Sequence, residues 1–150
     1  MMRRVLLTTS AVVVFVTGAC AQSGVLPGTT LMGEQAQALY RDLNGMVKGD
    51  SPYDKAKADA AIAKLKDTSA RIPAAFPESS KGKKSPNARY MASPKVWENP
   101  DAFKAKAVAL SKAIDDNAAK VGTLDGLKAA YPAISNACNS CHDEYRVRSN

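Results

Sequence analysis

Residues 123–145 read TLDGLKAAYPAISNACNSCHDEY, and this stretch decides the fold prediction. Its apolar side chains recur at the three- and four-residue spacing of an α-helix and form one stripe: Leu127, Tyr131, Ile134, Cys138, Cys141 and Tyr145. Thr123 is suited to open the helix as its N-cap. Because Pro132 falls inside the stretch, we expect it to kink the helix or to split off the first turn.

Three earlier segments show the same periodicity. The first spans about 31–47, with a stripe of Met32, Ala36, Leu39, Leu43 and Met46. The second follows a Gly-Asp-Ser-Pro break at 49–52, with Ser51 as its expected N-cap, Pro52 at the first helical position and Asp54 completing a capping box. It continues to about Ile72 and is expected to bury Ala58, Ile62, Leu65, Ser69 and Ile72.

The third segment opens with Asn99 and Pro100, another cap-and-proline start, and Gly122 is the expected C-cap residue. Its apolar face consists of Phe103, Ala107, Leu110, Ile114 and Ala118. No segment shows the two-residue period of a strand. The sequence therefore predicts an all-α fold, an antiparallel up-down-up-down four-helix bundle spanning residues 22–150.

Two features of this bundle need a physical reason. The connection at 73–98 holds four of the eight prolines and is long for a structureless loop. The apolar stripes are rich in alanine, which lets helices approach closely but leaves little bulk inside. We therefore expect something large, such as a porphyrin, to fill the interior.

The pentad Cys138-Asn139-Ser140-Cys141-His142 has the pattern of a c-type haem attachment site. Helical spacing places both thiols on one face, so each sulfur can add to a vinyl group of the same flat ligand. His142 follows at once, and its Nε2 can bind the iron from that side. The pattern predicts one covalent haem c near the C-terminal end of the fourth helix.

Two other uses of the cysteine pair fit the sequence less well. A thiol-disulfide enzyme prefers its Cys-x-x-Cys at a strand-to-helix junction of an α/β fold, and no such pattern is present. A closed zinc site needs four ligands, whereas His142 is the only histidine. A colourless protein from a host able to attach haem would favour the thiol enzyme.

Residues 1–21 are typical of a cleavable signal peptide, with a basic start, an apolar core and a small-x-small end at Ala19-Cys20-Ala21. Cys20 also allows a lipid anchor, although Thr17-Gly18-Ala19 fits a lipoprotein signal poorly. The apolar run is too short to span a bilayer comfortably. We expect a protein exported to the periplasm, without a membrane span.

The charge of +7 falls to +5 without the signal segment. Aromatic residues are few and not interleaved with the cations, so nucleic-acid binding is not indicated. A positive surface steers a protein toward acidic partners.

The second axial ligand of the iron is expected to be a methionine, because no second histidine exists. In the predicted bundle the first and fourth helices are antiparallel, so Met32 lies at the haem end. Met46 lies fourteen residues later, about 21 Å along the axis. Met91 sits in the long connection, which also lies at the haem end. Met32 is preferred, with Met91 and an open sixth position as the alternatives.

The residues of this chain resemble class II c-type cytochromes, the cytochrome c′ family. The resemblance spans essentially all of 22–150 and is carried by Cys138-x-x-Cys141-His142-Asp143-x-Tyr145-Arg146, by Lys48-Gly49-x-x-Pro52-Tyr53-Asp54, by Ser93-Pro94-Lys95-Val96-Trp97, by Ala75-Phe76-Pro77 and by Phe103-x-Ala105-Lys106. It implies a non-enzymatic monohaem protein, and in this family dimers commonly form through the first two helices. It also implies that Arg146 packs near the proximal imidazole.

The family divides into high-spin and low-spin members, and two positions of this sequence help to decide which kind it resembles. High-spin members leave the distal iron face open and bind nitric oxide or carbon monoxide, often with an arginine four residues before the distal position. Low-spin members carry a methionine ligand near the start of the first helix, and Leu31-Met32 resembles this kind. Position 28 is Gly28 and not arginine. The expectation is a periplasmic electron carrier with His142 and Met32 as iron ligands, and the alternative is a five-coordinate gas-binding protein.

Overall fold

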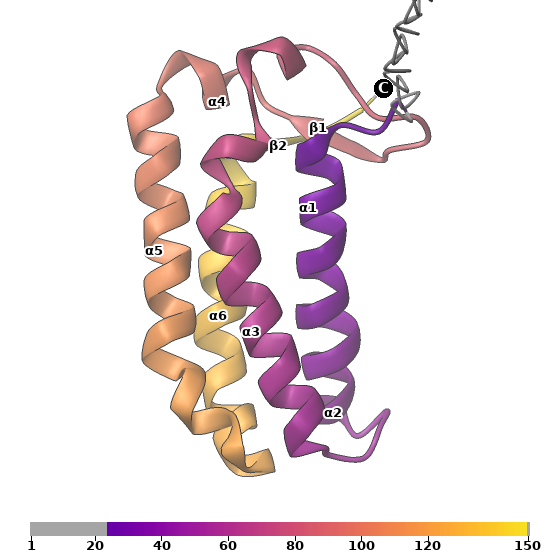
Figure 1. Cartoon of the computed structure of the whole chain (residues 1–150), viewed down its shortest axis with the longest axis vertical. Helices are drawn as coiled ribbons and strands as arrows, with labels where there is room; N and C mark the ends of the chain where they lie inside the picture. The colour runs from indigo at the N-terminus through magenta and orange to yellow at the C-terminus, as the bar shows by residue number, and fades with distance from the viewer. Residues whose placement is uncertain (1–23, 150) are drawn as a thin grey trace, which may run out of the picture.

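The computed structural model describes residues 24–149, and they form a bundle of four long antiparallel helices (Figure 1). The first long helix is continuous and consists of α1 (Pro27–Ala36), a π-helical segment η1 (Gln37–Leu43) and α2 (Asn44–Lys48). The other three are α3 (Lys55–Arg71), α5 (Pro100–Ala118) and α6 (Leu124–Tyr145). The predicted all-α up-down-up-down bundle is confirmed.

Short elements connect the long helices. They are the 3-10 turns η2 (Pro73–Ala75), η3 (Glu78–Ser80) and η4 (Ala119–Gly122), the short helix α4 (Lys95–Glu98), and the strands β1 (Tyr90–Ala92) and β2 (Arg146–Arg148). Within 24–149 no helix is both long enough and apolar enough to cross a bilayer. The predicted signal segment, with Cys20, lies outside the described residues.

Three of the long helices begin with a side chain that accepts a backbone N–H three residues ahead. These N-caps are Asp54 for α3, Asn99 for α5 and Thr123 for α6, at 3.0 to 3.1 Å. The predicted start of the second helix at Ser51 is therefore wrong. Asp54 caps the helix three residues later because its carboxylate accepts from Lys57, while the Oγ of Ser51 is buried without a partner.

The predicted C-cap at Gly122 is also wrong. Helix α5 ends at Ala118, and Gly122 closes the 3-10 turn η4 without entering the left-handed region. The break after the first helix is confirmed, because Gly49 has a φ of +81° and its N–H binds the carbonyl of Met46. Helix α6 runs unbroken through Pro132, so this proline does not split off the first turn.

The predicted stripes of α3, α5 and α6 face the core. Every residue expected to be buried on α3 is buried, and so are Phe103, Ala107, Leu110 and Ile114 on α5. Ala118 on α5 and Tyr131 on α6 are half-buried. The first helix departs from the prediction. Its π-helical segment η1 has more residues per turn than an α-helix, so the buried side of the helix before η1 is shifted by one residue. Gln35 is therefore buried and Ala36 is exposed.

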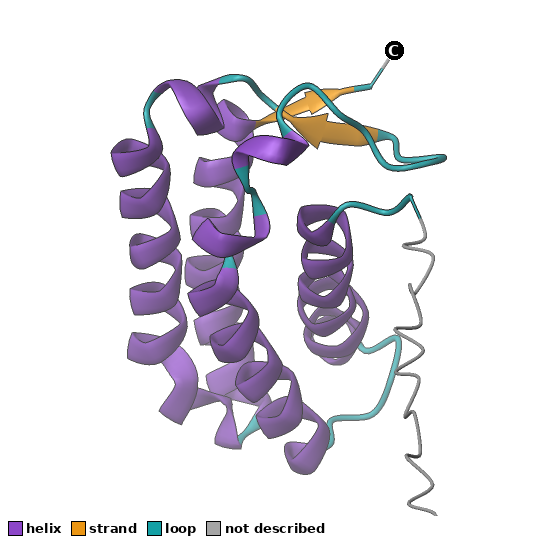
Figure 2. Cartoon of the chain, turned by 45° about the horizontal axis from the view of Figure 1, so that its top comes forward, coloured by secondary structure: helices purple, strands orange, loops and turns teal. Residues whose placement is uncertain are grey.

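The long connection has structure of its own, and part of it is a strand, contrary to the prediction of no strands. β1 pairs antiparallel with β2, with Met91 opposite Val147. Further hydrogen bonds join Ser93 to Tyr145 and Ser149 to Arg89 across the pair. The two strands lie together over one end of the bundle (Figure 2). Strands of three residues are too short for a two-residue period to show in the sequence.

Candidate haem site

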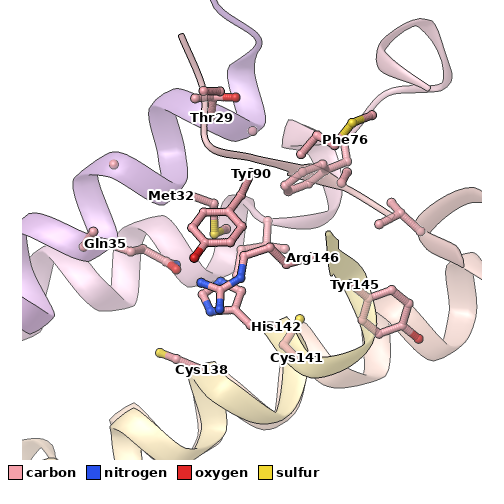
Figure 3. A pocket seen from close by; sticks show the side chains of 18 of the residues that line it. Thr29, Met32, Gln35, Phe76, Tyr90, Cys138, Cys141, His142, Tyr145 and Arg146 are labelled. Carbon is pink, nitrogen blue, oxygen red and sulfur yellow. The ribbon is translucent and has the colours of Figure 1, made fainter. Parts of the chain in front are cut away.

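A cavity of about 330 Å³ lies between α1 and α6 at the end of the bundle covered by the two strands (Figure 3). Its volume is within the range of about 300–1,000 Å³ typical of small-molecule and cofactor sites. The side chains of Met32, Cys138, Cys141 and His142 all line it. The structure thus brings together all four residues that the sequence predicted for the site.

The proximal side of the cavity is formed by the last turns of α6. Cys138 and Cys141 are free thiols three residues apart on the inner side of the helix. Burial raises the pKa of the Cys138 thiol to about 11, and the neighbouring Cys141 contributes to the increase. Burial also raises the pKa of Cys141. Both side chains face the cavity, where they could form thioethers with one haem.

His142 enters the cavity beside the two cysteines (Figure 3). Burial lowers the pKa of its imidazole, and the nearby charge of Arg146 lowers it further. The imidazole is accordingly neutral at neutral pH, the form that can bind a metal. Its Nδ1 is buried without a hydrogen-bond partner.

The distal side is formed by α1, and the three methionines within residues 24–149 lie where the bundle geometry predicts. Met32 is half-buried and lines the cavity opposite α6. Met91 on β1 also lines it. Met46 is buried in the core elsewhere, where its sulfur accepts the backbone N–H of Asp54 at 3.3 Å.

The start of α1 is closed by an aromatic ring. A Cβ on Gly28 would lie 2.5 Å from Cε1 of Phe76, so the ring occupies the place of a side chain there. Phe76 packs edge-on against Phe103 with centroids 5.4 Å apart, and Phe103 packs in the same way against Tyr145 at 5.1 Å. This aromatic row forms an apolar wall of the cavity.

The strand pair supplies the outer wall. Tyr90 projects from β1 into the cavity (Figure 3), and the guanidinium of Arg146 on β2 lies over its ring at 4.5 Å from the centroid. The predicted proximity of Arg146 to the imidazole is consistent with its effect on the pKa of His142.

This set of side chains fits a covalently attached haem. Two thiols on one helical face can form thioethers, and a neutral imidazole with a sulfur from the facing helix can supply both axial ligands. The walls are largely apolar, as a porphyrin requires. Among the described residues no group of three or more histidine, cysteine or acidic side chains could hold a metal ion alone.

Comparison with known proteins supports the same assignment. The sequence profile of the family described as Cytochrome C' matches residues 30–146. The chain belongs to the cytochrome c′ family. Members of this class II family bind covalently attached haem c, and haem c is the cofactor of this chain.

The relatives include proteins of several names. Cytochrome c-555 of Bradyrhizobium diazoefficiens is 43% identical over 118 residues, which cover 79% of this chain and 78% of that protein. Cytochrome c-556 of Rhodopseudomonas palustris is 32% identical over 145 residues, or 97% of each chain. Cytochrome c' of Alcaligenes xylosoxydans xylosoxydans is 36% identical over 109 residues, covering 69% of this chain and 77% of that one.

Solved structures of cytochrome c′ family members share the bundle. The NMR-validated structural model of oxidized R. palustris cytochrome c556 aligns with a TM-score of 0.70 at 33% identity, covering 82% of this chain and 95% of that one. The nitric oxide complex of a cytochrome c prime mutant from Alcaligenes xylosoxidans aligns with a TM-score of 0.68 at 31% identity, covering 81% and 91%.

Gln35 and Tyr90 are among the cavity side chains that sequence reasoning missed. Gln35 could have been found, because it lies three residues after Met32 on the same helix. Tyr90 gave no local signal, since its place depends on the pairing of β1 with a strand more than fifty residues away.

Proposed function

We propose that this chain is a periplasmic electron carrier, not an enzyme, in which Cys138 and Cys141 hold haem c through thioethers and His142 and Met32 bind its iron. The observation that carries the proposal is that His142 and Met32 line one cavity from two facing helices. The periplasmic location rests on family membership and on the signal-like sequence of residues 1–21.

When bound, the haem supplies an iron that alternates between the ferric and ferrous states. The chain's own residues fix its surroundings. Two covalent links near the end of α6 prevent loss of the cofactor, and ligands on two packed helices keep the change in geometry between the states small. The aromatic row of Phe76, Phe103 and Tyr145 excludes water from one wall.

The absorption spectrum of the purified ferrous protein tests the proposal. Sharp, split visible bands are expected for six-coordinate iron, and Met32→Ala should convert them to the broad band of a five-coordinate site. Met91→Ala is the matched control, because Met91 lines the same cavity, and it should leave the spectrum unchanged. If Met91→Ala changes the spectrum and Met32→Ala does not, the ligand is Met91.

The second candidate is a five-coordinate protein that binds nitric oxide or carbon monoxide. It is favoured by one finding, that an aligned cytochrome c prime structure is a nitric oxide complex. Rapid binding of carbon monoxide to the wild-type ferrous protein, together with a broad visible band, would establish this candidate and refute methionine ligation.

The electron-exchange surface is proposed to be the basic flap, which we define as residues 81–95 together with β2, Arg146–Arg148. These two segments carry seven lysine and arginine residues and no acidic residue. The flap also covers the cavity, because Arg89, Tyr90 and Arg146 line it. A partner protein with an acidic face would therefore be steered toward the haem edge.

Charge reversal tests this docking surface. Lys83 and Arg148 are exposed residues of the flap, and the double variant Lys83→Glu, Arg148→Glu should slow electron exchange with an anionic probe such as ferrocyanide at low salt. Lys48 and Lys128 are exposed on other parts of the bundle, so the same reversal there is the control. Equal effects of the two double variants would contradict a localised docking surface.

A further inference from the structure

Gln35 is an unexplained polar group inside the cavity. Its side chain is only 7% exposed and lines the cavity wall. The amide Nε2 is buried and has no hydrogen-bond partner. An amide donor removed from water without an acceptor costs free energy comparable to a lost hydrogen bond. An occupant of the cavity that offers an acceptor would remove this cost.

The position of Gln35 on α1 indicates where that acceptor lies. Met32 and Gln35 are three residues apart, and side chains at this spacing are neighbours on one side of a helix. Figure 3 shows the Gln35 side chain extending from α1 toward the side of the cavity that holds His142. The amide is therefore next to the space between Met32 and His142, where the iron and the end of its distal ligand would lie.

The cavity offers two kinds of acceptor once haem is bound, a propionate carboxylate and the distal ligand. A carboxylate is charged and is costly to bury, so it favours a solvated rim with cations nearby. The arginines that line the cavity, Arg89 and Arg146, belong to the flap at the end of the bundle. Gln35 lies one helical turn further from the flap than Met32 and is nearly inaccessible to water. This placement favours the distal ligand.

We propose that Gln35 is a positioning residue whose side-chain N–H donates a hydrogen bond to the sulfur of Met32 when that sulfur binds the iron. This inference rests on the proposed function, since it requires Met32 as ligand. A thioether sulfur is a weak acceptor with a second lone pair free for such a bond. The hydrogen bond withdraws electron density from the sulfur, which disfavours the electron-poor ferric state and raises the reduction potential.

The variant Gln35→Leu removes the donor with a side chain of similar size and no polar atom. The holoprotein should stay six-coordinate and low-spin, and its reduction potential should fall. The matched control is Gln37→Leu, because Gln37 is exposed on the same helix and its amide donates to Asp42 at the surface. Its potential should equal that of the wild type.

A second measurement uses the wild-type ferrous protein and does not depend on any variant folding. Proton NMR should show slowly exchanging side-chain NH₂ protons of Gln35 with nuclear Overhauser contacts to the methyl group of Met32. Contacts to propionate protons in their place would overturn the inference.

The outcomes separate this inference from the proposed function. A low-spin wild type whose potential is the same in Gln35→Leu overturns only the role of Gln35. A high-spin wild type overturns both, because Met32 would not be bound.

Discussion

Replacing Gly28 with alanine should destabilise the protein, because Phe76 leaves no room for a methyl group there. The new Cβ would lie 2.5 Å from Cε1 and 2.7 Å from Cζ of the ring. Carbon atoms in contact normally stay about 3.5–4.0 Å apart, so the ring would have to move by about 1 Å. Its packing against Phe103, which in turn packs against Tyr145, resists this movement.

The magnitude follows from two opposing contributions. Overpacking a closely packed site costs about 1–3 kcal/mol. Alanine recovers up to about 1 kcal/mol over glycine in helix propensity. We expect Gly28→Ala to lower the free energy of unfolding by about 1–2 kcal/mol, a loss of about 3–8 °C in Tm for a domain of this size. Thermal unfolding of the holoprotein, followed by circular dichroism, measures it.

Two controls isolate the clash. Gly45→Ala lies in α2, where the new Cβ would meet only the Oγ of Ser51, at 3.4 Å, and it should stabilise the protein slightly. Phe76→Leu removes the ring edge, so the double variant Gly28→Ala, Phe76→Leu should be more stable than the sum of the single effects predicts. A stable Gly28→Ala, or additive effects in the double variant, would refute the reasoning.

Three further outcomes are expected. Trp97→Phe loses the bond from Nε1 to the carbonyl of Phe76 at 3.1 Å and should cost about 1 kcal/mol in denaturant unfolding; an unchanged midpoint would contradict it. Asn99→Ala removes an N-cap bond of 3.1 Å and should cost about 1 kcal/mol, whereas Asn99→Ser should largely preserve stability. In folded protein made without haem attachment, iodoacetamide at pH 8 should modify the half-buried Cys141 before the buried Cys138, because the reagent reaches Cys141 more easily; burial raises the pKa of both thiols, and equal rates would refute this.

The helices and the attachment segment could be predicted because their signals are local. The apolar stripe on α6 and the pentad at 138–142 each become visible within a short stretch of sequence. The antiparallel order of the four helices then places Met32 at the same end of the bundle as the pentad. Two capping predictions, Ser51 and Gly122, were wrong, and the first of them shows why a local signal can be ambiguous. Ser51 and Asp54 are both good caps, and only the completed turn at 49–54 decides which one accepts the backbone N–H.

Two other features are not visible in the local periodicity of the sequence. The pairing of β1 with β2 joins residues 90–92 to residues 146–148, and no sequence pattern near either segment predicts it. The π-helical segment η1 changes which side of α1 is buried, so periodicity alone predicted Ala36 inward and missed Gln35. The strand pair forms the outer wall of the cavity and the first helix forms its distal side, so these were the least predictable parts of the site.

The two ends of the bundle differ in residue size although their apolar spacing is the same. Away from the cavity, large side chains such as Leu43, Met46 and Leu127 are fully buried and fill the interior. Around the cavity, small residues stand among the larger ones, at Gly33, Ala36, Ala88 and Ala92. Protein interiors are close-packed, and a cavity of about 330 Å³ is of the size that a bound cofactor fills. A haem attached to the last helix, as proposed, would fill this cavity and become part of the hydrophobic core.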